Sequence, residues 1–171
     1  MNIKDLTQFP AGHPPSPYNF PIQFQKGNKW GEVFLQDGLT LITIGWLGDC
    51  IPNRGATSSK CISRLWDAYE AELVISDGTA GWHDCELCHG EDEWYPGGQV
   101  GQIHEWQGRQ LRIYGHGHFL NQYNEIVYLS PALILHYILD HEYQPPGEFI
   151  EAVEKGKFLT PKNLVWIEND I

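Results

Sequence analysis

Basic residues are scarce in this sequence. Its 171 residues include 11 lysines and arginines against 22 aspartates and glutamates, which gives a formal net charge of −11. Nucleic-acid binding depends on Lys and Arg side chains that neutralise phosphates, so this balance argues against a nucleic-acid partner. It disfavours anionic membrane surfaces for the same reason. An acidic surface instead favours solubility, or the capture of a basic partner protein by electrostatic steering.

Long apolar runs and a secretion signal are also missing. No run approaches the ~18 apolar residues that a membrane span needs. Residues 1–21 are polar and proline-rich, and they lack the basic stretch, apolar run and small-residue cleavage site of a signal peptide. We therefore expect a soluble cytoplasmic protein with no membrane partner, in a compartment where thiols stay reduced.

Several nucleotide-binding and catalytic motifs are absent. The chain contains no G-x-G-x-x-G sequence and no P-loop, and its serines stand in no G-x-S-x-G context. The composition, 42% hydrophobic and 13% aromatic, is nevertheless that of a globular protein. This chain length is usual for one domain. We predict a single domain over residues 1–171, with an extended proline-rich lead-in over residues 1–29.

The first half of the chain is predicted to form strands followed by a helix. Residues 32–36 and 39–44 are rich in β-forming side chains and flank an Asp-Gly dipeptide, a pattern that predicts a hairpin. Apolar residues at helical spacing predict a helix over about 59–72, with Ser58 or Ser59 as its N-cap.

The second half begins with residues 76–108, which are glycine-rich and expected to be irregular. Residues 111–114 and 125–129 predict two strands joined by a polar loop. Ser130-Pro131 is typical of a helix start, and that helix is expected to stop before Pro145. A second short helix is predicted over residues 147–153, and Thr160-Pro161 is typical of a further helix start. This order predicts an α+β fold: a small antiparallel sheet packed with three or four helices, plus an irregular zinc-knuckle loop.

The sharpest chemical signal is the C-x2-C pair Cys85 and Cys88. This spacing lets two thiolates bind one zinc ion at about 2.3 Å each, and a tetrahedral structural site needs two more ligands. His136 and His141 form an H-x4-H pair that can supply them, and His83, within the knuckle, is the alternative ligand. Residues five apart on a straight helix point ~140° away from each other. The histidine pair therefore requires the helix to bend or to end near residue 140.

Three other interpretations of the knuckle compete with zinc. With His89 it matches the C-x-x-C-H motif of haem attachment, but the chain has one methionine as a possible axial ligand and no export signal. A redox C-x-x-C requires a helix N-terminus in a thioredoxin-like setting, and the pair lies in a glycine-flanked loop. Two buried thiols without metal are the third interpretation. A site that also recruits Cys50 and Cys61 stays open as well.

Two further groups are weaker candidates. His116 and His118 resemble the H-x-H of metal-dependent β-barrel enzymes, but the surrounding glycines and asparagines favour solvated histidines at a hairpin tip. The acidic run 91–93 could hold a cation, although such runs are more often simply solvated.

Residues 81–88 and 128–149 resemble a family of uncharacterised bacterial proteins that share an H-x-C-x2-C knuckle and a Y-x-x-P-x-L-I-x-H-Y helix ending in H-x-Y-x-P-P. The Gly-Trp-Leu sequence at residues 45–47 is similar to an early strand end of that family. The resemblance implies no activity. The resemblance does imply that five residues belong to recurring motifs of that family: His83, Cys85, Cys88, His136 and His141. This chain departs from the family pattern at Cys50 and in the longer loop over residues 115–124.

Three functional hypotheses follow. The first is a non-enzymatic cytosolic protein-interaction domain with a structural zinc site, of the immunity type or regulatory, that binds another, basic protein. The second is a metal-dependent hydrolase with an open zinc site at Cys85, Cys88 and His136, and with Glu86 or His141 as the base. The third is a structural or regulatory domain that serves a larger partner.

Overall fold

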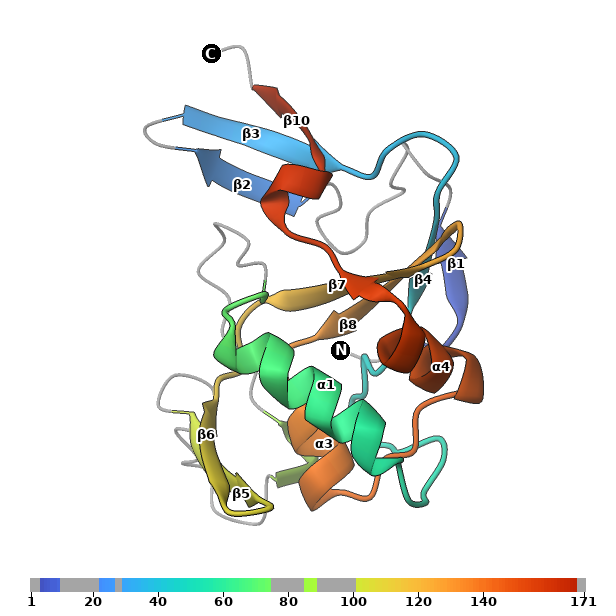
Figure 1. Ribbon diagram of the computed structural model, residues 1–171, viewed down its shortest axis with the longest axis vertical. Coiled ribbons are helices and arrows are strands. Elements are labelled where there is room, and N and C mark those ends of the chain that lie inside the picture. Colours follow the sequence, from blue (N-terminus) through green and yellow to red (C-terminus); the bar gives the residue numbers. More distant parts are fainter. Residues whose placement is uncertain (1–3, 10–21, 27–28, 75–84, 89–100, 169–171) are drawn as a thin grey trace.

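The computed structural model describes residues 4–9, 22–26, 29–74, 85–88 and 101–168 (Figure 1). The described strands are β1 (Thr7–Phe9), β2 (Ile22–Lys26), β3 (Lys29–Phe34), β4 (Thr40–Thr43), β5 (Gln102–Trp106), β6 (Arg109–Ile113), β7 (His118–Tyr123), β8 (Ile126–Pro131), β9 (Lys157–Phe158) and β10 (Val165–Glu168). The described helices are α1 (Ser59–Glu70), α3 (Ile134–Asp140) and α4 (Gly147–Lys155), with the 3-10 turns η1 (Glu86–Cys88) and η2 (Pro161–Asn163). Within these segments, no helix has both the length and the apolar character needed to cross a membrane.

The central element is a five-stranded mixed sheet in the order β1-β4-β8-β7-β9. Strands β4 and β8 run parallel, and the other neighbouring pairs run antiparallel. A three-stranded sheet, β10-β3-β2, and the two-stranded β5-β6 complete the described strands. The α+β prediction is confirmed, but the purely antiparallel sheet was wrong. Parallel neighbours need a long crossover, and the connection from β4 to β8 includes α1.

The hairpin predicted around the Asp-Gly dipeptide was also wrong. The turn exists, with Gly38 at a φ of 86°, but the strands on its two sides join different sheets. Strand β3 pairs with β2 and β10, whereas β4 pairs with β1 and β8. The dipeptide produces a local reversal of the chain. The pairing of β4 with β1 and β8 depends instead on its burial between segments that are distant in the sequence.

Other predicted irregular segments contain strands. The lead-in over residues 1–29 includes β1 and β2, and the segment 76–108 includes β5. The predicted polar loop over 115–124 contains β7, which pairs with β8 across its whole length. Ser130 and Pro131 end β8 instead of opening a helix, because Pro131 lies opposite His118 at the last position of the ladder, where a missing N–H is tolerated.

Helix signals with a local capping mechanism were more accurate. The α1 helix begins where predicted, and the Ser58 hydroxyl oxygen accepts the Cys61 N–H at 3.1 Å. The α4 helix extends the predicted 147–153 segment to Lys155, with Gly156 as its C-cap. Thr160 caps only the short turn η2, through a reciprocal hydrogen bond with Asn163, and β10 follows.

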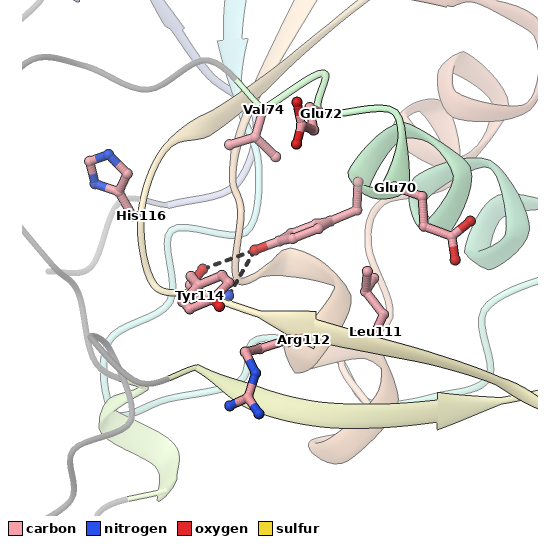
Figure 2. A pocket seen from close by; sticks show the side chains of 8 residues that line it. Glu70, Glu72, Val74, Leu111, Arg112, Tyr114 and His116 are labelled. Atoms are coloured by element: carbon pink, nitrogen blue, oxygen red, sulfur yellow. Dashed lines mark hydrogen bonds between the residues drawn. The ribbon is translucent and has the colours of Figure 1, made fainter.

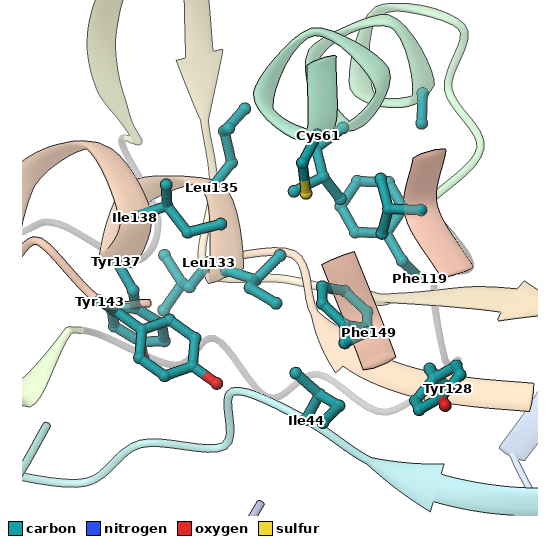
Figure 3. Close-up of a cluster of buried hydrophobic side chains, with 14 of the residues drawn as sticks. Ile44, Cys61, Phe119, Tyr128, Leu133, Leu135, Tyr137, Ile138, Tyr143 and Phe149 are labelled. Carbon is teal, nitrogen blue, oxygen red and sulfur yellow. The ribbon is translucent and has the colours of Figure 1, made fainter. Parts of the chain in front are cut away.

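All three described α-helices contribute to the core on one face of the five-stranded sheet (Figure 3). There Ile44 and Tyr128 lie in one buried cluster with Leu65 of α1, Leu135 of α3 and Phe149 of α4. A smaller cluster covers the other face, with Leu41, Leu120, Val127, Leu129 and Leu159. The α3 helix is buried from residue 134 to 138. It therefore holds its C-terminal end, with the histidine pair, in a fixed position.

Candidate metal centre

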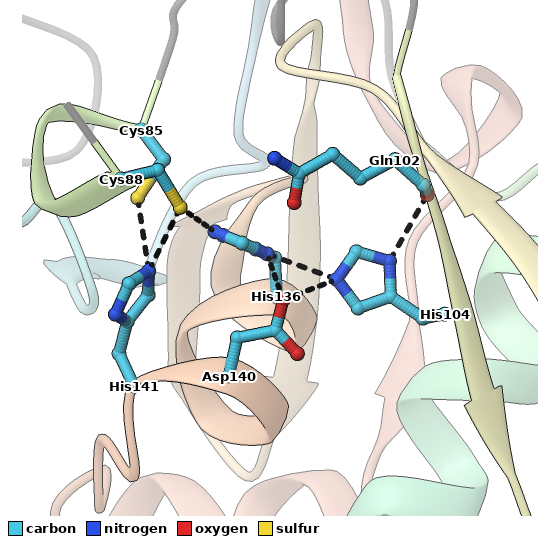
Figure 4. Close-up of polar contacts among 7 residues, drawn as sticks. All are labelled: Cys85, Cys88, Gln102, His104, His136, Asp140 and His141. Carbon is cyan, nitrogen blue, oxygen red and sulfur yellow. Dashed lines mark hydrogen bonds and ion pairs between the residues drawn. The ribbon is translucent and has the colours of Figure 1, made fainter. Parts of the chain in front are cut away.

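Two cysteines and two histidines converge at the end of α3 (Figure 4). Their ligand atoms all lie within 4.8 Å of one another. The His141 Nε2 atom is 3.3 Å from the Cys85 Sγ and 3.2 Å from the Cys88 Sγ, and the His136 Nε2 atom is 3.3 Å from the Cys88 Sγ. The four residues singled out by the sequence thus lie in one cluster.

The short turn η1 brings the two sulfurs together. The Cys88 N–H donates to the Cys85 carbonyl at 3.1 Å, which folds the chain back between them. Cys85 is buried and Cys88 is half-buried, whereas Glu86 between them is exposed. Both sulfurs are thus available on the side that faces α3.

The end of α3 brings the two histidines together. The helix ends at Asp140, and His141 follows as its C-cap with φ −116° and ψ 9°. Glu142 then takes a left-handed conformation with φ 55°, a common way to end a helix. The Tyr143 N–H returns to the Tyr137 carbonyl at 3.1 Å. The sequence-based condition that the helix must end near residue 140 is confirmed.

The distances suit a tetrahedral metal. Zinc bond lengths of about 2.3 Å to sulfur and about 2.0–2.1 Å to nitrogen place ligand atoms about 3.5 Å apart across a tetrahedral angle. The observed sulfur–nitrogen separations of 3.2–3.3 Å are slightly shorter. Two thiolates and two imidazoles form a common structural zinc set, so the cluster is compatible with a metal such as zinc.

Burial controls the protonation of the cluster. It raises the pKa of Cys85 to about 12, and the neighbouring Cys88 thiol adds to this rise. It also lowers the pKa of His136 to about 4, against the opposing charge of Asp140. The pKa of His141 is lowered by burial too. Neutral imidazoles are the form that binds a metal, and a buried thiolate requires a neighbouring cation.

The other ring nitrogen of His136 has two partners. Its Nδ1 atom lies 3.0 Å from the Asp140 Oδ2 and 2.9 Å from the His104 Nε2. A carboxylate on the far nitrogen of a ligand histidine fixes its tautomer and orientation. The His104 residue is 5% exposed, and its Nδ1 atom lies 3.0 Å from the Gln102 carbonyl oxygen.

Sequence reasoning missed His104, and its strand offered no usable signal. In β5 the apolar Ile103 points outward with 58% exposure, while the polar His104 points inward. This reverses the alternation from which a buried strand face is usually predicted. Asp140 was noted only as the place where the helix had to end.

The remaining candidate residues lie elsewhere. Cys61 is fully buried in the core, where burial raises its pKa to about 12. Cys50 is exposed, and neither cysteine joins the cluster. His118 begins β7, with its ring 5.2 Å from that of Trp46, and is therefore no loop histidine. The predicted candidates outside the described residues are His83, His89 and the acidic run 91–93.

A surface pocket of about 540 Å³ lies between the end of α1 and β6 (Figure 2). Tyr69 and Tyr114 line it and are joined by two hydrogen bonds. The Tyr69 hydroxyl donates to the Tyr114 carbonyl at 3.2 Å and accepts the Tyr114 N–H at 2.8 Å. Its lining residues belong to neither cluster of potential metal ligands found in the described segments. Both clusters of potential metal ligands in the described segments lie at α3, away from this pocket.

Comparison with known proteins adds a family but no activity. No curated protein and no solved structure matches the chain. A family model described as a domain of unknown function, DUF7919, matches residues 1–154, a span that includes the knuckle, all of α3 and most of α4. The expected resemblance to an uncharacterised family is confirmed at this level, and its particular motifs and bacterial origin stay predictions. The protein belongs to the DUF7919 family.

Proposed function

We propose that this protein is a non-enzymatic protein-interaction domain built around one structural zinc ion, held by Cys85, Cys88, His136 and His141. The observation that carries the proposal is the position of His141, whose Nε2 atom lies within 3.3 Å of both sulfurs. Catalytic zinc sites keep one position open for water, and structural sites fill all four. Here His141 would supply the fourth protein ligand and occupy that position.

The zinc ion would act as a cross-link. It would join η1 to the end of α3, two segments that are 48 to 56 residues apart in the chain along the observed contacts. The α3 helix is buried in the core, and the single turn η1 packs against the same core cluster through Leu87 and Cys88. Metal bonds between them would add to this packing and fix η1 against the end of α3.

The partner we infer is a basic protein, bound in the cytoplasm. The charge of −11 supports this inference, and so do the exposed acidic side chains beside the metal centre, on Glu86, Asp140 and Glu142. Acidic surfaces attract basic partners and raise their association rates at low salt. An immunity-type or regulatory binding protein would use its surface in this way.

The hydrolase alternative requires an open metal at Cys85, Cys88 and His136. In that mechanism Glu86 or His141 would act as the base on a metal-bound water, and the His141 ring would stand back from the sulfurs. Instead the His141 Nε2 atom lies 3.3 Å from the Cys85 Sγ and 3.2 Å from the Cys88 Sγ, as near as the His136 Nε2 lies to the Cys88 Sγ. The geometry therefore favours four protein ligands over three.

Metal analysis tests the zinc site. Protein purified without added metal should contain about one zinc per chain, and cobalt in its place should give the intense thiolate charge-transfer and visible bands of a tetrahedral site. A hydroxamate inhibitor should leave the cobalt spectrum unchanged, because no coordination position is free. Substoichiometric metal would contradict the zinc site, and a hydroxamate-induced spectral change would support the hydrolase instead.

Co-purification at two ionic strengths tests the partner. A tagged chain expressed in its own cells should retain a basic protein at 50 mM salt and release it at several hundred millimolar, where charges are screened. Cys85→Ser should lose the same protein, whereas Cys50→Ser, at an exposed site outside the cluster, should keep it. Retention that is independent of both salt and Cys85 would contradict a charge-steered, zinc-organised surface.

A further inference from the structure

Beside the proposed zinc site, three ligand atoms form a nearly equilateral triangle (Figure 4). The His136 Nδ1 atom is 2.9 Å from the His104 Nε2 and 3.0 Å from the Asp140 Oδ2, and the last two atoms are 3.0 Å apart. The atoms come from β5 and from α3, so tertiary structure brings them together. None of these three atoms is a ligand atom of the proposed zinc site, because His136 would bind zinc through its other nitrogen, Nε2.

In the form of the two rings that binds metals, the triangle holds one proton and two acceptors. The Gln102 carbonyl oxygen only accepts, so the contact at 3.0 Å places an N–H on the His104 Nδ1 atom. Metals bind the neutral imidazole, and in that form the His104 Nε2 atom presents a lone pair. The Asp140 carboxylate also only accepts. With His136 bound to zinc through Nε2, its single Nδ1–H is the one proton that faces both acceptors, which lie 3.0 Å apart. A cation at this position would satisfy all three atoms.

We propose that His104, His136 and Asp140 form a second metal site, in which the His136 ring bridges two divalent ions. The inference rests on the proposed zinc site, because it needs the His136 Nε2 on the first ion. Binding of the second ion would replace the Nδ1 proton of His136, which leaves to solvent. The ring then becomes an imidazolate with one metal on each nitrogen.

The geometry favours a different class of metal from the first site. Ligand atoms 2.9–3.0 Å apart with metal bonds of about 2.1 Å imply ligand–metal–ligand angles of about 90°. This is one face of an octahedron. Two imidazoles and a carboxylate on one face suit Fe²⁺, Mn²⁺ or Co²⁺, whereas a four-ligand set with two thiolates suits zinc.

The second site is also more open than the first. The two histidine rings are buried, but the Asp140 side chain is 44% exposed. The remaining coordination positions of the second ion would lie toward solvent on the Asp140 side. Water or a small oxygen ligand could occupy them, which the four-ligand zinc site does not allow.

Cobalt titration of the zinc-loaded full chain tests this inference. Elemental analysis first establishes one zinc per chain, so that a missing first site is recognised before cobalt is added. We expect one further equivalent of Co²⁺, with weak visible bands, no thiolate charge-transfer band, and release of at least one proton per cobalt in weakly buffered solution. The zinc should stay bound throughout.

Matched variants locate the cobalt. Asp140→Asn, at a half-exposed position, should keep one zinc and weaken cobalt binding at least tenfold, and His104→Gln should do the same if its thermal melt shows a folded protein. Glu142→Gln removes the same charge two residues away and should bind cobalt as the wild type does. No second equivalent, a thiolate band that signals displaced zinc, or unchanged binding by Asp140→Asn would each overturn the second site.

Discussion

At the scale of single residues, the metal centre depends on side chains that are expensive to bury without partners. Cys85 and His136 are 7% and 1% exposed. The His136 ring uses one nitrogen toward the Cys88 sulfur and the other toward Asp140 and His104. A buried polar atom without a partner costs roughly 1–3 kcal/mol. Loss of the metal or of one ligand would therefore leave other buried polar atoms of the cluster without a partner.

The cysteines should separate clearly by substitution. Cys85→Ser and Cys88→Ser should lose the zinc and lower the melting temperature by on the order of 10 °C, because structural metal binding adds directly to folding free energy. Cys61→Ser places a hydroxyl in the core and should cost a few degrees, about 1–2 kcal/mol. Cys50→Ser, at an exposed position, should cost almost nothing. Calorimetry with metal analysis measures both effects, and equal losses for all four variants would indicate a four-thiolate site.

The metal-free protein should lose stability in mild acid. Burial lowers the pKa of His136 from 6.5 to about 4, so between these values the unfolded chain binds the proton and the folded chain does not. Stability is fully present above about pH 6.5 and declines as the pH falls toward 4, by about 3 kcal/mol in total for this group. Denaturant unfolding of chelator-treated protein measures the decline. His136→Asn should show a shallower slope over this interval, and identical slopes would contradict the assignment.

At the scale of elements, the sequence predicted those segments whose structure is set by near neighbours along the chain. Ser58 caps α1 through a bond to a residue three positions away, and α4 covers the predicted 147–153 segment before its glycine C-cap. The knuckle and the end of α3 are local features as well, so four candidate ligands could be named in advance. Strand β7 and the inward turn of His104 depend on contacts with distant segments. Neither feature can be recognised from the local alternation of apolar and polar residues. In β5 that alternation is reversed, because the apolar Ile103 is exposed and the polar His104 is buried.

The left-handed residue after α3 gives a test of that element. Glu142 has a φ of 55° and an exposed side chain that contacts Arg54 only at 4.0 Å. Glycine adopts this conformation without strain, whereas a β-branched residue pays roughly 1–2 kcal/mol. Glu142→Gly should therefore equal or exceed the wild type in stability, and Glu142→Val should fall about 1 kcal/mol below it. Zinc content should follow the same order under mild chelation, because this turn presents His141. A more stable valine variant would refute the cap geometry.

At the scale of the whole molecule, one carboxylate ties together three distant parts of the chain. Asp5 Oδ1 accepts the Gly45 N–H at 2.8 Å, and Asp5 Oδ2 accepts the Tyr143 hydroxyl at 2.7 Å. Gly45 follows β4, and Tyr143 follows the metal-binding end of α3. The Tyr143 ring is fully buried. The N-terminal segment thus closes over the junction between the sheet and the metal centre.

Replacing Asp5 should reveal how much this closure contributes. Asp5→Ala leaves the buried Tyr143 hydroxyl and the Gly45 N–H without their acceptor, which should cost about 2–4 kcal/mol, or roughly 5–15 °C in melting temperature. Asp5→Asn keeps an oxygen for the Gly45 N–H, and the Tyr143 hydroxyl can rotate to accept from the amide, so most of the stability should remain. Both variants should retain zinc, since neither changes a ligand. Equal losses for alanine and asparagine would mean that the charge of Asp5, and not its two hydrogen bonds, holds the N-terminal segment in place.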